Sequence, residues 1–506
     1  MAKTNINYTP LNLIAFNFGG FACIAIVVFL ASTQPFYISE VIGITADDKI
    51  GSIIGTLGFT DELVSIASSA FVGTLTDKLN NLGFRGSRLI QSSGFLVISL
   101  SLFGYGVLSK NIYPDLLFFR SIFALGVTSC MSMVTVMLNE LSNSDFHFKK
   151  FIFWKQLPNL IELDDVLETG NRNEDKKNGK YAALIGISTG LGAIFSVSFF
   201  LSLPIKLMNR NTDWTLKDGL KASYLIVAVF AIIAFAFLFT FLYNGNKKVT
   251  EEAEGEVLLG SNVEDSEEKL PYLSLLYKGI QISKVNQRVQ LSYIGAFVAR
   301  STTVTTAVFI PLLVYNYYYK HGECKSIDYP NKKNCSDGFI FSAILTGVAQ
   351  TIALISSPLW GYLIDTERVG KFRTLMIAAL IGVLGNYGIC LIGTTRNGVY
   401  DPHTVACFVM VSLIGLSQIG IIITSMSVLS GLSHNTSHMG SLSGLYSLSG
   451  GIGILIITKV GGIWSDYWIL GPFFLLGTFN VVLLAASISY FQAEKHQIEL
   501  SADSED

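Results

Sequence analysis

Twelve long apolar runs constrain what this chain can fold into more than any other feature. A helix that crosses a hydrocarbon core of ~30 Å needs about 20 apolar residues. Runs of this length form two groups of six, near residues 11–32, 52–76, 88–108, 115–137, 181–205 and 220–243, and near 289–316, 338–363, 374–394, 403–429, 440–462 and 470–491. They are apolar on all sides rather than alternating with a period of two, which argues against a transmembrane barrel. The pattern predicts an all-α, multi-pass membrane protein with about twelve transmembrane helices in two six-helix bundles.

Almost half of the charged residues lie in three polar segments, residues 138–180, residues 244–288 and the tail after Tyr490. Charged residues make up 14% of the 506 residues, against about 25% in a soluble domain. This composition excludes a disordered chain, a nucleic-acid binder with a basic surface and a disulfide-stapled secreted module. We expect an N-terminal bundle with a polar insertion, a linker, a C-terminal bundle and a tail, over residues 1–243 (insertion 138–180), 244–287, 288–491 and 492–506.

Basic residues predict how the chain is oriented. Short turns rich in Lys and Arg follow the second and the eighth runs, at residues 78–88 and 368–373, whereas the basic turn at 205–220 is a counter-example. Cytosolic loops carry an excess of Lys and Arg. We therefore expect both termini, the insertion and the linker to be cytosolic.

An internal repeat relates the two groups of runs. A shift of 288 residues lays the first of two matching segments over the second, Ser68-Ser69-x-x-x-Gly73-x-Leu75-x-Asp77 over Ser356-Ser357-x-x-x-Gly361-x-Leu363-x-Asp365. Each segment leads into a basic turn, Arg85-Gly86-Ser87-Arg88 or Gly370-Lys371-Phe372-Arg373. Unrelated helices seldom agree at five spaced positions and share the flanking chemistry as well. The sequence therefore predicts a duplicated structure.

The repeated segment resembles the signature of the major facilitator superfamily, roughly Gly-x-Leu-x-Asp-Arg-x-Gly-Arg-Arg, which lies between spans two and three and recurs between eight and nine. In this chain the spacing from the Asp to the next Gly is longer, six positions in the first copy and five in the second. The resemblance implies a secondary transporter whose two bundles expose one central site to each side in turn. It also implies a set of gating residues, Gly73, Asp77, Arg85, Arg88, Gly361, Asp365, Gly370, Lys371 and Arg373.

Ionisable residues inside the runs are costly in a membrane and therefore indicate function. At 1.5 Å per residue, Glu62 lies about 22 Å from the cytosolic end of its helix and Arg120 about 9 Å from the opposite surface, so acid and base share one depth. We expect Asp61 or Glu62 to carry a coupling proton that Arg120 tunes. We expect Arg300 to bind the carboxylate or phosphate of a solute. Two alternatives remain open: a structural ion pair with Arg120, or an acid that reaches the lipid headgroups.

Neutral polar residues inside the runs are further candidates for lining a solute site. Each could instead form a hydrogen bond between helices. The repeat aligns Glu62 with one of them, Gln350, so the acid belongs to the first half alone. The candidates are Asn17, Gln350, Asn386, Gln418 and Tyr446.

Two loops carry other short signals. The exterior loop 317–337 contains Cys324 and Cys335, which we expect to form a disulfide, and an acceptor pattern that makes Asn334 a glycosylation candidate. The linker contains an acidic-dileucine sorting pattern with Glu254, Leu258 and Leu259. The sorting pattern points to a vacuolar or lysosomal membrane, with the plasma membrane as the alternative.

Catalytic and metal-binding patterns carry little weight here. The Gly-x-Ser-x-Gly match at 186–190 lies inside a helical run, and His434 and His438 lack a third ligand nearby. No Walker-type loop with its Lys is present. We therefore expect no enzyme activity, metal or cofactor.

The expected function is proton-coupled transport of a small organic solute by a monomeric chain. Its partners are the solute, protons and membrane lipids, with no nucleic acid. A facilitative sugar-type carrier and a drug/proton antiporter are alternatives, and Gly186, Gly190 and Gly192 resemble the antiporter motif without its Pro. A transporter-like solute sensor is the alternative from another class.

Overall fold

The structure is a computed structural model. It describes residues 10–44, 49–81, 85–142, 185–210, 213–242, 286–321, 334–366, 369–392, 395–396, 399–430 and 439–503. Within these residues, twelve helices are long and apolar enough to cross a membrane. The prediction of an all-α chain with about twelve spans in two groups is confirmed.

The first six spans form the N-terminal bundle. Its elements, with π-helical segments labelled η, are α1 (Pro10–Tyr37), η1 (Ile38–Ile42), α2 (Ile50–Asn81), α3 (Gly86–Phe103), η3 (Gly104–Leu108), η4 (Ile112–Leu116), α4 (Leu117–Ser142), η6 (Ser196–Phe200), α7 (Leu203–Arg210) and α8 (Leu216–Phe241). The fifth span, Ile185–Arg210, contains η6 and α7 and is called span 5 below.

The last six spans form the C-terminal bundle. Its elements are α10 (Gln287–Val304), η8 (Thr305–Phe309), α11 (Ile310–Lys320), α12 (Asn334–Asp365), α13 (Gly370–Leu391), β1 (Thr395–Arg396), β2 (Val399–Tyr400), α14 (Val405–Ser430), α15 (Met439–Tyr467) and α16 (Gly471–Asp503). The two short strands pair antiparallel as a hairpin. The exterior loop expected over 317–337 is shorter than predicted, because α11 continues to Lys320 and α12 begins at Asn334.

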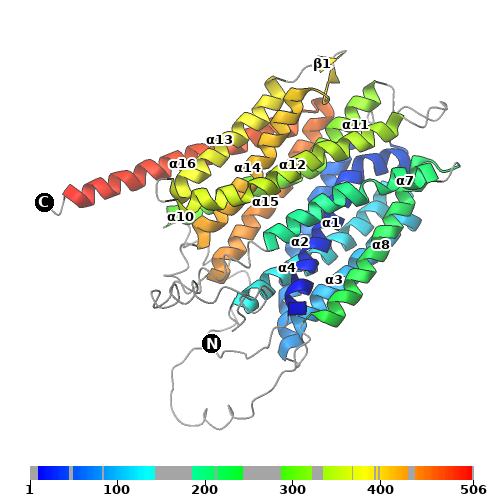
Figure 1. Cartoon of the computed structure of the whole chain (residues 1–506), viewed down its shortest axis with the longest axis horizontal. Helices are drawn as coiled ribbons and strands as arrows, with labels where there is room; N and C mark the ends of the chain where they lie inside the picture. The colour runs from blue at the N-terminus through cyan, green and yellow to red at the C-terminus, as the bar shows by residue number, and fades with distance from the viewer. Residues whose placement is uncertain are drawn as a thin grey trace, which may run out of the picture.

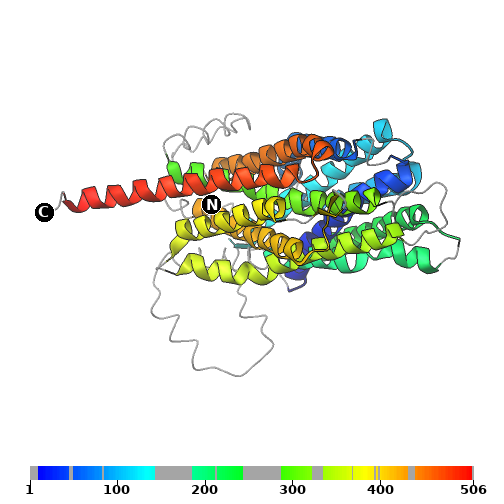
Figure 2. The same cartoon turned by 90° about the horizontal axis from the view of Figure 1, so that it is seen from above.

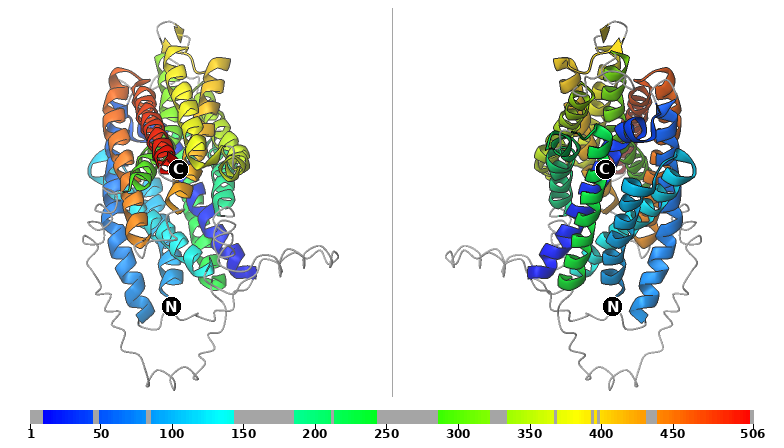
Figure 3. Two further views of the ribbon diagram at one scale, coloured as in Figure 1. Left: turned by 90° about the vertical axis from the view of Figure 1, so that its left-hand side faces the viewer. Right: turned by 90° about the vertical axis from the view of Figure 1, so that its right-hand side faces the viewer.

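The long helices of both bundles run roughly along one axis (Figures 1 and 2). α1 begins and α16 ends at one end of the molecule, the termini end, and the β1–β2 hairpin lies at the other, the hairpin end (Figure 1). The bundles touch along two seams, and α1 and η1 also contact α11, where the Tyr315 hydroxyl donates to Ser39 Oγ at 2.7 Å. In one seam α2 packs on α15, and in the other span 5 packs on α12. Figure 3 shows α2 (blue) and α15 (orange) on the same side of the molecule.

The first span is longer than the apolar run near 11–32 predicts. Helix α1 continues through Gln34 and Pro35 to Tyr37, and η1 extends the span to Ile42. Gln34 is only 2% exposed, and its side-chain carbonyl accepts a hydrogen bond from Arg120 that compensates for its lost water. A polar residue that is paired inside the bundle does not end a span.

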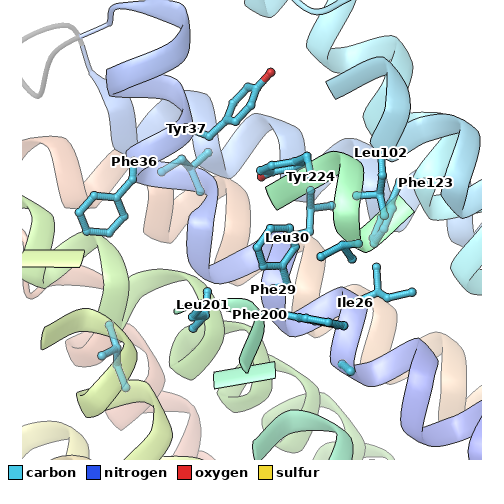
Figure 4. Close-up of a cluster of buried hydrophobic side chains, with 14 of the residues drawn as sticks. Ile26, Phe29, Leu30, Phe36, Tyr37, Leu102, Phe123, Phe200, Leu201 and Tyr224 are labelled. Atoms are coloured by element: carbon cyan, nitrogen blue, oxygen red, sulfur yellow. The ribbon is translucent and has the colours of Figure 1, made fainter. Parts of the chain in front are cut away.

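Aromatic side chains around α1 form the core of the N-terminal bundle (Figure 4). The rings of Tyr37, Tyr105 and Tyr224 lie 5.0–5.4 Å apart, and Phe29 contacts Tyr224 at 5.0 Å. The Tyr224 hydroxyl shares a 2.8 Å hydrogen bond with Thr33, and the Tyr37 hydroxyl donates to the Tyr105 carbonyl at 2.6 Å. Each such ring pair contributes about 0.5–1.5 kcal/mol beyond its buried area. This core fixes α1 against η3 and α8 and so positions the charged residues beside it.

Candidate functional site

Arg120 and Asp61 form an ion pair inside the N-terminal bundle. The Arg120 Nε donates to Asp61 Oδ2 at 2.6 Å, and its Nη1 donates to Gln34 Oε1 at 2.9 Å. The side chains of Arg120 and Asp61 are only 10% and 22% exposed. The charges of Asp61 in α2 and Arg120 in α4 therefore compensate each other within one bundle. Helix α1 supports this pair through Gln34.

Glu62, the next residue on α2, faces the other bundle. A Cβ added to Gly451 of α15 would lie 2.5 Å from Glu62 Oε1, so the carboxylate rests on that glycine. Arg300 of α10 rests on the neighbouring glycine, since a Cβ at Gly450 would lie 2.6 Å from its Cγ. The positive charge of Arg300 acts on Glu62, although the two groups are not within the 4 Å of an ion pair. An acid and a base from opposite bundles thus meet at two adjacent glycines.

Tyr446 and Ser425 extend this group within the C-terminal bundle. The Tyr446 hydroxyl shares a 2.9 Å hydrogen bond with Ser425 Oγ, and the charge of Arg300 acts on Tyr446. Tyr446 lies one helical turn before Gly450, on the same face of α15. Arg300 is exposed although it lies about 20 Å into its helix. Among the described residues, no carboxylate lies within 4 Å of its guanidinium.

Gln350 lies at the second seam between the bundles. It shares a face of α12 with Gly347 and Leu354, which are three residues before and four residues after it. A Cβ at Gly347 would lie 2.8 Å from Val197 of span 5, and a Cβ at Gly190 of span 5 would lie 2.7 Å from Leu354. Gln350 is therefore placed at an interface, opposite an apolar part of span 5.

The other three polar candidates are bonded within a single bundle. Asn17 donates to the Leu13 carbonyl at 2.8 Å and accepts from Ser188 at 3.1 Å. Gln418 accepts a hydrogen bond from Thr306 at 3.2 Å and donates one to Thr303 at 3.3 Å.

Asn386 is fully buried and donates to Gly382 in its own helix at 2.8 Å. These contacts are those of interhelical or local hydrogen bonds, and they do not bring the three side chains to Glu62 and Arg300.

The motif glycines at the termini end have free space around them. A Cβ at Gly73 or at Gly361 would meet no described atom within 4 Å. At the hairpin end of the same helix α2, by contrast, a Cβ at Gly55 would collide with the carbonyl of Thr458 in α15. In the part of the chain that the structure describes, α2 is therefore packed closely on α15 at the hairpin end, and the motif glycines make no such close contact.

The basic motif residues bind within their own bundles. Arg88 donates to the Phe239 carbonyl at the end of α8, and Lys371 donates to the Ser427 carbonyl of α14 at 3.0 Å. Arg373 lies 5.2 Å from the centre of the Phe491 ring. Arg85 is the residue before the first turn of α3.

The backbone of the turn between α12 and α13 favours a glycine at position 370, the glycine of the second motif copy. Gly370 has φ +70°, a conformation that favours glycine. The side chains of Asp77 and Asp365 lie outside the described part of the structure.

Sequence reasoning missed two charged residues of α15. Lys459 donates a hydrogen bond to Thr56 Oγ1 of α2 at 3.0 Å, and Asp466 accepts from the backbone N–H groups of Gly51 and Ser52 at 2.8 and 3.0 Å. Both sets of bonds cross from one bundle to the other. Lys459 is the single base in the apolar stretch from Ile452 to Trp464, and that isolation is the signal that could have found it.

Several expected features fall outside the described residues. These are Cys324, the side chains of Asn334 and Cys335, and the linker residues Glu254, Leu258 and Leu259. The structure records Cys23, Cys130, Cys390 and Cys407 as free thiols within the spans.

Two bundles of six membrane-spanning helices, with ionisable side chains where they meet, define a multi-pass membrane protein of the transporter class. The sequence model of the Major Facilitator Superfamily matches residues 170–458, more than half of the chain. The chain belongs to this superfamily, and it is an integral membrane transporter.

Individual relatives are distant. The magnetosome protein MamH of Paramagnetospirillum magneticum is 19% identical over 479 residues, which cover 93% of this chain and 90% of MamH. Among solved structures, a mutant of the nucleoside transporter NupG superposes with a TM-score of 0.62 at 13% identity, covering 95% of this chain and 99% of NupG. A D-xylose-proton symporter gives a TM-score of 0.59 at 13% identity, with 94% and 95% coverage. At these identities the structural likeness shows the fold alone.

Proposed function

We propose that this transporter couples proton movement to the transport of a small organic solute that carries an anionic group. The observation that supports the proposal most is the meeting of Glu62 and Arg300 at adjacent glycines of α15. The acid comes from one bundle and the base from the other, so their interaction changes whenever the bundles move relative to each other. Alternating access of one central site accounts for such an arrangement.

Glu62, rather than Asp61, is the proton carrier in this proposal. Asp61 is bonded to Arg120 at 2.6 Å and belongs to a cluster supported by Gln34. Glu62 has no ion-pair partner within 4 Å among the described residues, and it lies at the seam. An ionised Glu62 attracts Arg300, whereas a protonated Glu62 leaves Arg300 to an anion. Proton and anionic solute are therefore expected to bind together.

The proposed orientation of the protein in the membrane follows from the basic turns. We place the termini end, with the insertion 138–180 and the linker 244–287, in the cytosol. The packed hairpin end then faces the exterior or a lumen, and the free space at Gly73 and Gly361 belongs to a conformation open to the cytosol. A vacuolar or lysosomal membrane is favoured by the sorting pattern in the linker, and the plasma membrane is the alternative.

The fold is compatible with several solute classes. The solved structures of this fold include a nucleoside transporter and a D-xylose-proton symporter, so neutral solutes and proton coupling both occur on it. Arg300 is the feature of this chain that favours an anionic group, because a guanidinium binds a carboxylate or phosphate in a fork geometry.

A solute screen followed by flux measurements tests the proposal. Purified protein is screened for thermal stabilisation by carboxylates, phosphorylated metabolites, sugars and nucleosides, since a ligand that binds the folded state stabilises it. The stabilising solute is then offered to proteoliposomes with and without an imposed pH gradient. Accumulation driven by the gradient supports proton coupling. Downhill flux that ignores the gradient identifies a facilitative carrier, and exchange against protons identifies an antiporter. Binding without any flux identifies a sensor.

A further inference from the structure

Lys459 is a charged residue inside a span that the proposed solute and proton sites do not use. It is partly buried in α15, and its Nζ donates to Thr56 Oγ1 of α2 at 3.0 Å. In the described part of the chain, no carboxylate lies within 4 Å of it. An ammonium group has three N–H donors. The packed seam therefore gives this side chain one neutral partner among the described residues in exchange for part of its water.

Asp466 lies seven residues further along α15 and faces the start of α2. Its two carboxylate oxygens accept hydrogen bonds from the N–H groups of Gly51 and Ser52, at 2.8 and 3.0 Å. These N–H groups belong to the first turn of a helix, where a negative charge is stabilised. Packing α2 against α15 therefore gives the Asp466 carboxylate two charge-assisted hydrogen bonds that offset its loss of water.

Closure of the hairpin end has the opposite effect on Lys459. The loss of water from a charged group costs more than one hydrogen bond to a hydroxyl returns. When α2 and α15 separate at this end, the ammonium regains water while Thr56 loses only one bond. The charge of Lys459 therefore favours the open hairpin end, although its hydrogen bond spans the closed one.

We propose that Asp466 and Lys459 set the balance between the closed and the open hairpin end, and that they act in opposite directions. Asp466 holds α2 against α15, and Lys459 keeps that closure reversible. Lys459 is a positioning residue, because it acts on the transport site through α2. Near the same end the bundles also meet through α1, η1 and α11, where Tyr315 donates a hydrogen bond to Ser39 Oγ at 2.7 Å and its ring lies 5.6 Å from that of Phe36. These groups are uncharged, so the two opposing charges at the closed end belong to the α2–α15 seam. The inference rests on the alternating access proposed above and is independent of proton coupling and of the solute.

Distances between spin labels on opposite bundles test this proposal. In a cysteine-substituted chain, labels at Lys110 and Val405 report on the hairpin end, and labels at Lys78 and Arg373 report on the termini end. All four positions are exposed and lie away from the seam. Asp466→Asn is expected to raise the population with an open hairpin end. That variant also serves as the background in which a decrease can be measured.

Two substitutions at one hydrogen bond separate charge from bonding. Thr56→Val removes the acceptor and leaves the charge, so it should raise the open population. Lys459→Met removes the charge, so it should lower the open population about tenfold in the Asp466→Asn background, a change equivalent to about 1.4 kcal/mol. Lys459→Arg keeps the charge and should leave the population within twofold.

An open population that rises in Lys459→Met, or stays within twofold of its background, overturns the proposal, because Lys459 would then be part of the closure or irrelevant to it. A different failure is separable. If Asp466→Asn leaves the open population within twofold of the wild type, this inference is overturned, whereas alternating access is contradicted only by the failure of the flux measurements described above.

Discussion

Glu62 of α2 and Gln350 of α12 occupy equivalent positions in the two bundles, because the 288-residue repeat places one over the other. Each lies at a seam with the opposite bundle, Glu62 against Gly451 and Gln350 between the contacts of Gly347 and Leu354. One seam therefore carries an ionisable group where the other carries a neutral amide. We assign proton binding to the α2–α15 seam for this reason.

The Arg120–Asp61 pair is expected to contribute to stability more than to transport. Arg120→Met leaves a carboxylate unpaired inside the bundle and should lower the free energy of unfolding by about 3 kcal/mol. The double variant Arg120→Met/Asp61→Asn should lose less than the sum of the single variants, because no unpaired charge remains. Thermal unfolding of the four proteins in detergent measures this. Additive losses would contradict a direct pair.

The glycines of α2 should respond differently to the same substitution. Gly55→Ala places a Cβ against the Thr458 carbonyl, and overpacking of this kind costs about 1–3 kcal/mol. Gly73→Ala meets open space in this conformation and should leave the unfolding temperature unchanged. It should still slow solute flux, because the termini end must close during the cycle. Equal destabilisation by both variants would argue against separated bundles at Gly73.

The aromatic core around α1 allows a matched comparison of one substitution. Tyr224→Phe removes the buried hydrogen bond to Thr33 and should lower the free energy of unfolding by about 1 kcal/mol. Tyr387→Phe removes a 3.2 Å bond to Thr478 at an exposed site and should change it by less than about 0.5 kcal/mol. Denaturation curves of both variants, measured under one condition, make the comparison. A larger loss at Tyr387 would contradict the importance of this core.

Arg300 is expected to determine the affinity for the anionic group of the solute. Arg300→Met should weaken binding about 10- to 100-fold, because a hydrogen bond to a charged group contributes about 1.5–3 kcal/mol. Arg300→Lys keeps the charge but loses the fork of N–H donors, so its affinity for the solute should lie between those of Arg300→Met and the wild type. Isothermal titration with the solute from the thermal screen measures the three affinities. Unchanged affinity in Arg300→Met would remove this residue from the solute site.

Local features of the sequence were sufficient to predict the fold. The length of the apolar runs determines the spans, and the repeat of the Gly73 segment at Gly361 indicates the duplication. The helical rise also places Arg120 at the depth of the acidic pair. The structure has a bond between Arg120 and Asp61, as this shared depth allows.

Contacts across the bundles could not be predicted in the same way. Which of Asp61 and Glu62 faces the other bundle depends on how α2 packs against α15, and one residue of rotation exchanges their surroundings. Gln34 lay beyond the expected end of its span, so its bond to Arg120 was not anticipated. The roles of Lys459 and Asp466 depend on their hydrogen bonds to hydroxyl and N–H groups of α2, which the sequence alone does not reveal.

The role of Glu62 is the central claim, and the solute identified by the screen allows a direct test in proteoliposomes. Uptake driven by a pH gradient is compared with solute exchange at equal pH in the wild type and in Glu62→Gln, with Asp61→Asn and Glu62→Gln/Gln350→Glu as controls. The expected result is that Glu62→Gln loses gradient-driven uptake, that exchange persists, and that an acid at position 350 does not restore coupling because Arg300 lies at the other seam. Gradient-driven uptake at the wild-type rate in Glu62→Gln would contradict the account.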